Sequence, residues 1–212
     1  MNIIQDFIPI GRKNRPSRAN PMKYITIHNT GNPDKGAGAK NHAAYAKSDG
    51  AANVPVSWHY TVDEQVIYQH LPDKEDAYHA GDGGGNGNRQ SIGIEICMNS
   101  DGDLRGATDN AAWLTAQLCK KYGIPAENIV QHNRWSGKDC PKMLRSGKPY
   151  DWNTFISKVK KELSLPAATP APEPPRILYR IQTGAYTLKA NADTALAKVK
   201  AAGFTDAYIV AA

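Results

Sequence analysis

The stretch Ser91–Ile96 constrains this chain more than any other. Its sequence, SIGIEI, is apolar and β-branched with one carboxylate, which predicts a buried strand that carries a charge. Alternation along a strand places the three isoleucines on one face and Gly93 and Glu95 on the other. An ionised carboxylate inside a sheet is costly unless it is paired or lies beside a metal. The alternative is that Glu95 faces solvent on an edge strand.

Three residues elsewhere supply the ligand types of a metal site. His28 ends a predicted strand over 24–28, His132 ends a short extended segment over 129–132, and Cys140 lies in a polar turn. Catalytic zinc is held by three protein ligands and leaves a fourth position to water. Taken singly, each histidine is more simply structural. The three residues together with Glu95 predict a catalytic zinc site, because a structural zinc would need a fourth protein ligand.

The predicted chemistry assigns a role to each neighbouring residue. A zinc ion held by one thiolate and two neutral imidazoles keeps net positive charge, so it can polarise a carbonyl group and activate water. Glu95 is the candidate to take the proton of that water and pass it to a leaving amine. Lys138 can add positive charge where an oxyanion develops, or it is a solvated loop lysine. His79 lies where a residue in contact with substrate is expected.

Patterns along the chain predict an α/β domain followed by an appendage, which 212 residues can accommodate. A polar arm is expected over 8–20. The predicted elements are strands over 24–28, 56–62, 65–69, 91–96 and 129–132 and helices over 37–48, 108–122 and 151–163, with Thr108 or Asp109 as the cap of the second helix.

The segment SLPAATPAPEPP over 164–175 predicts a proline-rich linker between a domain at 1–163 and a module at 176–212. The module has a strand–helix–strand pattern, with strands over 177–183 and 207–210 and a helix over 191–202. So small a unit cannot bury a stable core alone. We therefore expect the module to be half of a domain, which is either completed by self-association with a second copy or truncated.

Bulk properties exclude some classes of function. A net charge of +6 favours polyanionic partners, but no nucleic-acid motif is present, so no nucleic-acid partner is predicted. No apolar run is long enough to span a bilayer, and we predict no membrane insertion. The first residues lack a secretory signal, which predicts synthesis in the cytoplasm.

Three widely spaced cysteines do not form a disulfide framework, and Cys97 and Cys119 are expected to be buried. The glycine-rich run over 81–88 lacks phosphate-loop spacing and predicts a mobile surface loop beside the site, with a nucleotide role as the weaker alternative.

At these residues the chain resembles the zinc-dependent N-acetylmuramoyl-L-alanine amidases of the type-2 amidase and peptidoglycan-recognition-protein superfamily. The matching segments are YITIHNTGNP, VSWHYTVD, AYHAGDGGGNGNRQSIGIEICMN and QHNRWSGKDCP. They occur in the right order over residues 20–145. Within the superfamily the chain is most similar to amidases of bacilli, clostridia and their phages, including endolysins.

The resemblance implies a mixed central β-sheet flanked by helices, with Zn²⁺ held by His28, His132 and Cys140. It implies hydrolysis of the amide between N-acetylmuramic acid and L-alanine of bacterial peptidoglycan. Glu95 matches the catalytic glutamate of the bacterial and phage branch, and Lys138 matches a catalytic lysine of some members.

Two features of the chain qualify what the resemblance implies. Trp58 stands where some members have a catalytic tyrosine; it cannot transfer a proton, and we assign it, like His79, to substrate contact. The run from Leu178 to Val210 resembles the first half of a SPOR domain, a fold that binds glycan strands.

These observations lead to two hypotheses. The first is a wall-lytic amidase, best described as a phage or prophage endolysin released through a holin-type pore, with a host autolysin exported another way as the alternative. The second is a non-catalytic peptidoglycan-binding protein, against which Cys140 and Glu95 argue, since relatives that only bind wall fragments generally lack the cysteine ligand.

Overall fold

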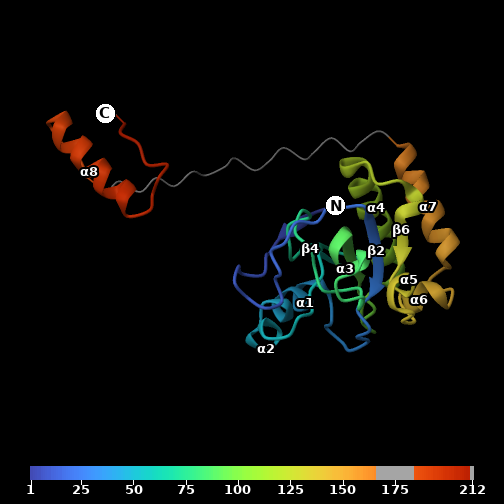
Figure 1. Ribbon diagram of the computed structural model, residues 1–212. Coiled ribbons are helices and arrows are strands. Elements are labelled where there is room, and N and C mark those ends of the chain that lie inside the picture. The colour runs from blue at the N-terminus through green and yellow to red at the C-terminus, as the bar shows by residue number, and fades with distance from the viewer. Residues whose placement is uncertain (166–183, 211–212) are drawn as a thin grey trace. The chain divides into compact units, whose positions relative to one another are not determined.

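The computed structural model describes residues 1–165 and 184–210 (Figure 1). The chain divides into two compact units, Met1–Thr169 and Pro170–Ala212. No helix among the described residues has the length and apolar character needed to cross a membrane. The first unit contains every residue that the sequence assigned to the site.

The described strands of the first unit form one six-stranded sheet in the order β1-β4-β3-β5-β2-β6. They are β1 (Ile3–Gln5), β2 (Tyr24–Asn29), β3 (Tyr60–Val62), β4 (Ile67–Gln69), β5 (Ser91–Ile96) and β6 (Ile129–Gln131). Strands β3 and β4 are antiparallel, and the other neighbouring pairs are parallel. The predicted mixed sheet is therefore confirmed, with β3 and β5 at its centre and β2 beside β5.

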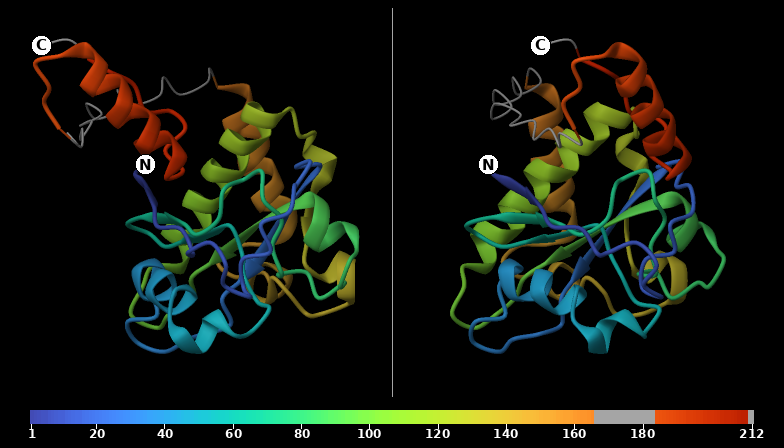
Figure 2. Two further views of the ribbon diagram at one scale, coloured as in Figure 1. Left: turned by 60° about the vertical axis from the view of Figure 1, so that its left-hand side comes forward. Right: turned by 90° about the vertical axis from the view of Figure 1, so that its left-hand side faces the viewer.

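Helices cover both faces of this sheet. The helices of the first unit are α1 (Ala39–Ala46), α2 (Asp49–Ala52), α3 (Asn86–Gln90), α4 (Leu104–Tyr122), α5 (Asn133–Ser136), α6 (Lys142–Arg145) and α7 (Trp152–Ser164), with a 3-10 turn η1 (Ala126–Asn128). Figure 2 shows α4 and α7 on one side of the sheet and α1 and α2 on the other. The first unit thus has three layers, with the sheet between two layers of helices.

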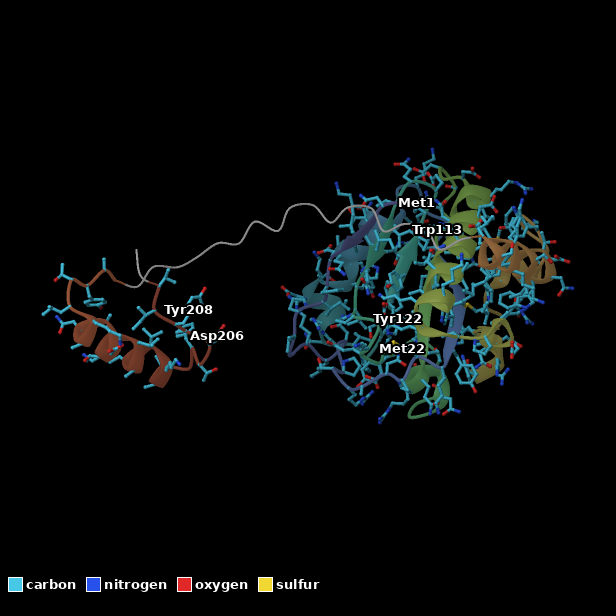
Figure 3. The ribbon with its side chains drawn as sticks, turned by 90° about the horizontal axis from the view of Figure 1, so that it is seen from above. Met1, Met22, Trp113, Tyr122, Asp206 and Tyr208 are labelled. Carbon is cyan, nitrogen blue, oxygen red and sulfur yellow. The ribbon has the colours of Figure 1, made fainter. Side chains whose placement is uncertain are left out.

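The main hydrophobic core lies between the sheet and the pair α4 and α7. The three isoleucines of β5 are fully buried in it, together with Ile25 and Ile27 of β2. Met22, Trp113 and Tyr122, labelled in Figure 3, are partly buried and pack against this core. The alternation predicted for β5 is confirmed, and it leaves Gly93 and Glu95 on the opposite face, where the site lies.

Helix α4 begins earlier than the sequence indicated. We expected a cap at Thr108 or Asp109, but Asp103 is the cap and its side chain accepts a hydrogen bond from the backbone N–H of Arg105. Thr108 is instead buried inside the helix, where its hydroxyl donates to the Leu104 carbonyl. Gly106 is a weak helix former, so nothing in the sequence indicated that the first turn of α4 includes it. The predicted end is confirmed, because Gly123 adopts a φ of 66° there.

The N-terminal arm is packed rather than free. Ile8 is fully buried, and the Arg15 guanidinium donates two hydrogen bonds to the Glu75 carboxylate at 2.7 and 2.8 Å. Strand β1, which the sequence did not reveal, pairs with β4 at the edge of the sheet. Its three residues carry too short a pattern to be recognised without the partner strand.

The second unit contains helix α8 (Lys189–Ala201), which confirms the helix predicted over 191–202. The strand predicted over 207–210 is wrong, since these residues form no strand. Their apolar side chains are largely exposed, and no neighbouring strand in the described part of this unit offers backbone partners. The strand predicted over 177–183 and most of the linker predicted over 164–175 lie outside the described residues.

Phe155 provides a test of the core that does not touch the site. Its side chain is fully buried in the core and stacks on Trp152 with ring centroids 5.5 Å apart. We expect Phe155→Ala to lower the free energy of unfolding by about 3–5 kcal/mol, because it removes an aromatic side chain and leaves a cavity. Denaturant titration measures this loss. A change below about 1 kcal/mol would contradict the packing of α7 described above.

Candidate metal centre and active-site groove

The carboxyl ends of β2, β5 and β6 bring the predicted site residues together. His28 on β2 stands in register with Glu95 on the neighbouring strand β5. His132 directly follows β6, which pairs with the other side of β2. Cys140 lies in the loop between α5 and α6 and is buried. Parallel strands end at one edge of a sheet, so residues far apart in the sequence converge there.

His28, His132 and Cys140 form a compact and buried ligand cluster. The Nδ1 atoms of the two histidines are 2.9 Å apart, and the Cys140 Sγ is 3.8 Å from the His28 Nδ1. The three ligand atoms all lie within 4.8 Å of one another. Among the described residues these three could hold a metal ion, and two imidazoles with one thiol are a donor set that suits zinc. Their role as ligands remains a prediction.

The hydrogen bonds of His132 show that its Nδ1 is available as a ligand. Its Nε2 is 3.0 Å from the Ala80 carbonyl oxygen, which can only accept, so Nε2 carries the proton. A neutral imidazole has a single N–H, and the lone pair on Nδ1 therefore points at His28. Burial lowers the pKa of His132, and nearby Lys138 lowers it further, which keeps the ring neutral.

Glu95 lies next to the cluster with an unused oxygen. Its Oε1 is 3.9 Å from the His28 Nδ1, its side chain is 18% exposed, and its buried Oε2 has no hydrogen-bond partner. Burial raises the pKa of Glu95 to about 7, against the lowering effect of Lys138. A carboxylate with this pKa exchanges protons readily near neutral pH, as a general acid–base residue must. The alternative of a solvent-facing glutamate on an edge strand is wrong, because β5 is central.

Desolvation sets the protonation of the other ligands in the metal-free protein. Burial lowers the pKa of His28 well below its usual value, with further lowering by His79 and His132. Burial raises the pKa of the Cys140 thiol to about 11, helped by the negative charge of Glu95. Both imidazoles are therefore neutral, and a metal ion would have to displace the thiol proton to bind.

A groove of about 1040 Å³ opens over the cluster. Glu95, His132 and Lys138 line it, and the Lys138 side chain is exposed to solvent. Arg18 and Arg89 also line it and share the buried Asp76 carboxylate as an ion-pair partner, at 2.8 and 3.6 Å, so two arginines and one carboxylate leave net positive charge there. His28 and Cys140 are buried and are not among the residues that line the groove, so the cluster meets the groove at His132, beside Glu95 and Lys138.

Trp58 lines the same groove but is mostly an interior residue. It is 7% exposed, packs in a second hydrophobic cluster with Ile8 and Leu71, and donates a 2.6 Å hydrogen bond from Nε1 to the Thr61 hydroxyl. A small part of the indole remains at the groove wall. Contact of Trp58 with a substrate remains a prediction.

His79 has a partner that the sequence did not reveal. It lines the groove but is only 8% exposed, and its Nδ1 is 2.9 Å from the Nε2 of His28. The two residues are 51 positions apart, and no local pattern connects them. The expected role in substrate contact remains a prediction, while the contact with a metal-ligand candidate is a new observation.

The glycine-rich run is more structured than the surface loop that we expected. Its second half begins helix α3, and the Asp82 carboxylate accepts hydrogen bonds from the backbone N–H groups of Gly87 and Asn88 at 2.7 and 3.1 Å. Gly81, Gly83 and Gly84 line the groove. The run therefore forms part of the wall of the site.

The pKa of Glu95 provides a test of this electrostatic arrangement. In the zinc-free protein we expect its carboxyl group to titrate at about 7, and Lys138→Met to raise that pKa, because the ammonium group now favours the charged form. NMR of the side-chain carboxyl carbon measures both values. Lys142→Met is the control, since Lys142 lines a separate groove. An unchanged pKa in Lys138→Met would mean that Lys138 does not act on Glu95.

Comparisons with known proteins agree with this geometry. Residues 18–143 match the family model described as N-acetylmuramoyl-L-alanine amidase. The N-acetylmuramoyl-L-alanine amidase CwlH of Bacillus subtilis is 49% identical over 170 residues, which cover 80% of this chain and 65% of that protein. The amidase XlyA of the same species is 52% identical over 155 residues, 73% of this chain and 50% of that protein. The chain thus spans less than two thirds of the curated relatives that it matches.

A solved structure extends the match to the fold. The catalytic domain of XlyA superposes with a TM-score of 0.70 at 50% identity, and the alignment covers 75% of this chain and 99% of that domain. The matched family model spans more than half of the 212 residues and contains His28, Glu95, His132 and Cys140. The chain therefore belongs to the N-acetylmuramoyl-L-alanine amidase family.

Proposed function

We propose that this chain is a zinc-dependent peptidoglycan hydrolase that cleaves the amide bond between N-acetylmuramic acid and the L-alanine of the stem peptide. The observation that carries the proposal is the convergence of His28, His132 and Cys140 beside the unpartnered carboxylate oxygen of Glu95. Membership of the amidase family supports the same reaction.

The three ligands fit zinc and would hold it by two nitrogen atoms and one sulfur atom. When bound, zinc would supply Lewis-acid activation of the scissile carbonyl group and of water. With three protein ligands the site keeps a position for these oxygen atoms, which distinguishes it from a structural zinc site.

Glu95 carries the proton between the two halves of the reaction. Its carboxylate accepts a proton as water attacks the carbonyl carbon, and it then donates that proton to the amine nitrogen of L-alanine as the carbon–nitrogen bond breaks. Lys138, exposed at the groove, supplies positive charge near the oxygen that becomes negative in the tetrahedral intermediate. Trp58 cannot transfer protons, so this route does not use it.

The groove provides the surface for the polymer. Its volume of about 1040 Å³ accommodates several units of a peptide or glycan. Lys138, with Arg18 and Arg89 around the single carboxylate of Asp76, gives it net positive charge. The stem peptides of bacterial walls carry carboxylates, which this potential attracts. We assign Trp58 and the exposed part of His79 to the wall of the substrate site.

The biological setting is part of the proposal. A structure described as a mutant endolysin from Bacillus subtilis matches 75% of this chain at 50% identity with a TM-score of 0.70, and this likeness supports a phage or prophage endolysin that acts on the cell wall. Release through a holin-type pore, glycan binding by the SPOR-like module at 176–212 and self-association through that module remain predictions from the sequence.

Digestion of purified peptidoglycan tests the reaction. We expect mass spectrometry to find free stem peptides with an N-terminal L-alanine and glycan strands of unchanged length. Binding to the wall without release of peptides would favour the non-catalytic recognition hypothesis. Shortened glycan strands would contradict the proposed bond.

A further inference from the structure

The hydrogen bonds behind His28 determine which of its nitrogen atoms faces the ligand cluster. The His79 ring lies edge-on to the His28 ring, with centroids 5.0 Å apart, and the two rings share one hydrogen bond between His28 Nε2 and His79 Nδ1. Which nitrogen donates depends on the other contact of His79, a 3.4 Å approach of its Nε2 to the Ser91 hydroxyl oxygen.

Ser91 has one hydrogen, and its position follows from its closest acceptor. The Ser91 hydroxyl donates to the Gly87 carbonyl at 2.6 Å, so every other polar group near this oxygen must donate to it. The Thr26 hydroxyl therefore donates to Ser91 at 2.8 Å, and its own oxygen accepts a hydrogen bond from the Trp135 Nε1 at 2.9 Å. The remaining contact is His79, whose Nε2 therefore carries a proton.

The position of the proton on His79 determines that on His28. A histidine that binds a metal ion does so as a neutral imidazole, which carries a single N–H, and the two rings share one hydrogen bond. With its proton on Nε2, His79 offers the lone pair of Nδ1, and His28 must donate from its Nε2. The lone pairs of the His28 Nδ1 and the His132 Nδ1 then face each other at 2.9 Å, with the Cys140 Sγ 3.8 Å from the His28 Nδ1. No proton lies between the two nitrogen atoms in this arrangement, and a metal ion bound by both would satisfy them.

Ala80, the residue after His79, holds the proton of the second histidine, His132, on Nε2. The Ala80 carbonyl binds the Nε2 of His132 at 3.0 Å, and the side-chain oxygen of Asn88 accepts the backbone N–H groups of both His79 and Ala80 at 2.8 Å. Gly93 leaves room for this support, since a Cβ there would lie 2.8 Å from the His79 ring. The segment His79–Ala80, held by Asn88 of the glycine-rich run, thus contacts the Nε2 atoms of both His28 and His132.

We propose that His79 is a positioning residue, which holds His28 in the tautomer that binds the metal, and that the glycine-rich run over 81–88 serves to anchor His79 and Ala80. This inference rests on the proposed zinc-dependent function. It assigns the run a role in supporting the ligands, distinct from phosphate binding, and explains why His79 is buried in a groove that binds substrate.

Two replacements of His79 distinguish the effect of its hydrogen bond to His28 from the effect of the volume that its side chain fills. His79→Asn keeps an acceptor, because the Asn Oδ1 occupies the place of the His Nδ1, whereas His79→Leu removes it. We expect zinc affinity, measured by competition with a chelator, to fall about 10–100-fold in His79→Leu, the usual cost of losing such a support. We expect His79→Asn to recover most of this loss. His70→Phe, at a buried histidine that contacts Thr61 and no ligand, is the control and should keep wild-type zinc affinity.

A second measurement has a wild-type part that does not depend on a folded variant. Nitrogen-15 NMR of the histidine rings in the zinc-free wild type should find the His28 proton on Nε2, and in His79→Leu a growing fraction on Nδ1. Equal zinc affinity of His79→Leu and the wild type, or a wild-type proton on the His28 Nδ1, would overturn the positioning role. A wild type that binds no zinc would instead contradict the proposed function, while its NMR spectrum would still decide the tautomer.

Discussion

Glu95→Gln is expected to lower kcat about 10²–10⁴-fold on peptidoglycan, the usual contribution of a positioned general acid–base residue. Glutamine keeps the size of the side chain but can neither accept the proton of water nor deliver it to the leaving amine. Because Glu95 is not among the three clustered ligands, zinc content should stay at the wild-type level. Release of stem peptides and bound zinc, measured on the same preparation, check both expectations.

The matched control for this variant is Glu127→Gln. Glu127 is exposed in the turn η1 and does not line the groove, so its replacement should leave kcat unchanged. Retention of a tenth or more of the wild-type kcat in Glu95→Gln would mean that another group carries the proton. A zinc-free Glu95→Gln would instead show that the carboxylate is needed to hold the metal.

Local patterns in the sequence were enough to predict the centre of the fold. Alternation along β5 separated three buried isoleucines from Glu95, and this separation holds because a strand has only two faces. The ends of β2 and β6 placed His28 and His132 at strand-to-loop transitions. Asp151 was recognised as the start of α7, since its carboxylate accepts a hydrogen bond from the backbone N–H of Thr154.

The features that the sequence did not reveal depend on partners distant in the chain. Strand β1 exists only through its pairing with β4, more than 60 residues away. The strand predicted over 207–210 has suitable residues but no strand beside it among those described. Propensity indicates that a segment can be a strand, whereas pairing decides whether it is one.

In the site, too, the residue types could be predicted from the sequence, whereas the contacts between distant residues could not. Two histidines, one cysteine and one glutamate indicated the chemistry, because histidine and cysteine are the usual ligands of zinc and a glutamate can move a proton. The support of His28 by His79 could not be found in this way. A buried histidine has the same local signature whether it contacts a metal ligand, as His79 does, or a threonine, as His70 does.

Cys140→Ser is expected to weaken zinc binding by more than about 100-fold, because loss of a supporting residue alone costs 10–100-fold and serine replaces a thiolate ligand by a poor one. The consequence for stability follows from mass action. Zinc at 100 times its Kd stabilises the wild type by about 2.7 kcal/mol, and the same free zinc concentration should give Cys140→Ser no more than about 0.4 kcal/mol. Thermal unfolding with and without zinc, beside a direct affinity measurement, provides both quantities.

Cys119→Ala distinguishes loss of a ligand from loss of a buried thiol. Cys119 is buried in the main core and lies outside the cluster, so its replacement should lower stability slightly in the metal-free protein and leave the zinc-induced gain intact. If Cys140→Ser kept the zinc-induced gain, Cys140 would not be a ligand, and His28 and His132 alone would have to hold the metal. Loss of the gain in Cys140→Ser alone would assign the sulfur ligand to the loop between α5 and α6 and connect zinc binding to the groove that contains Glu95.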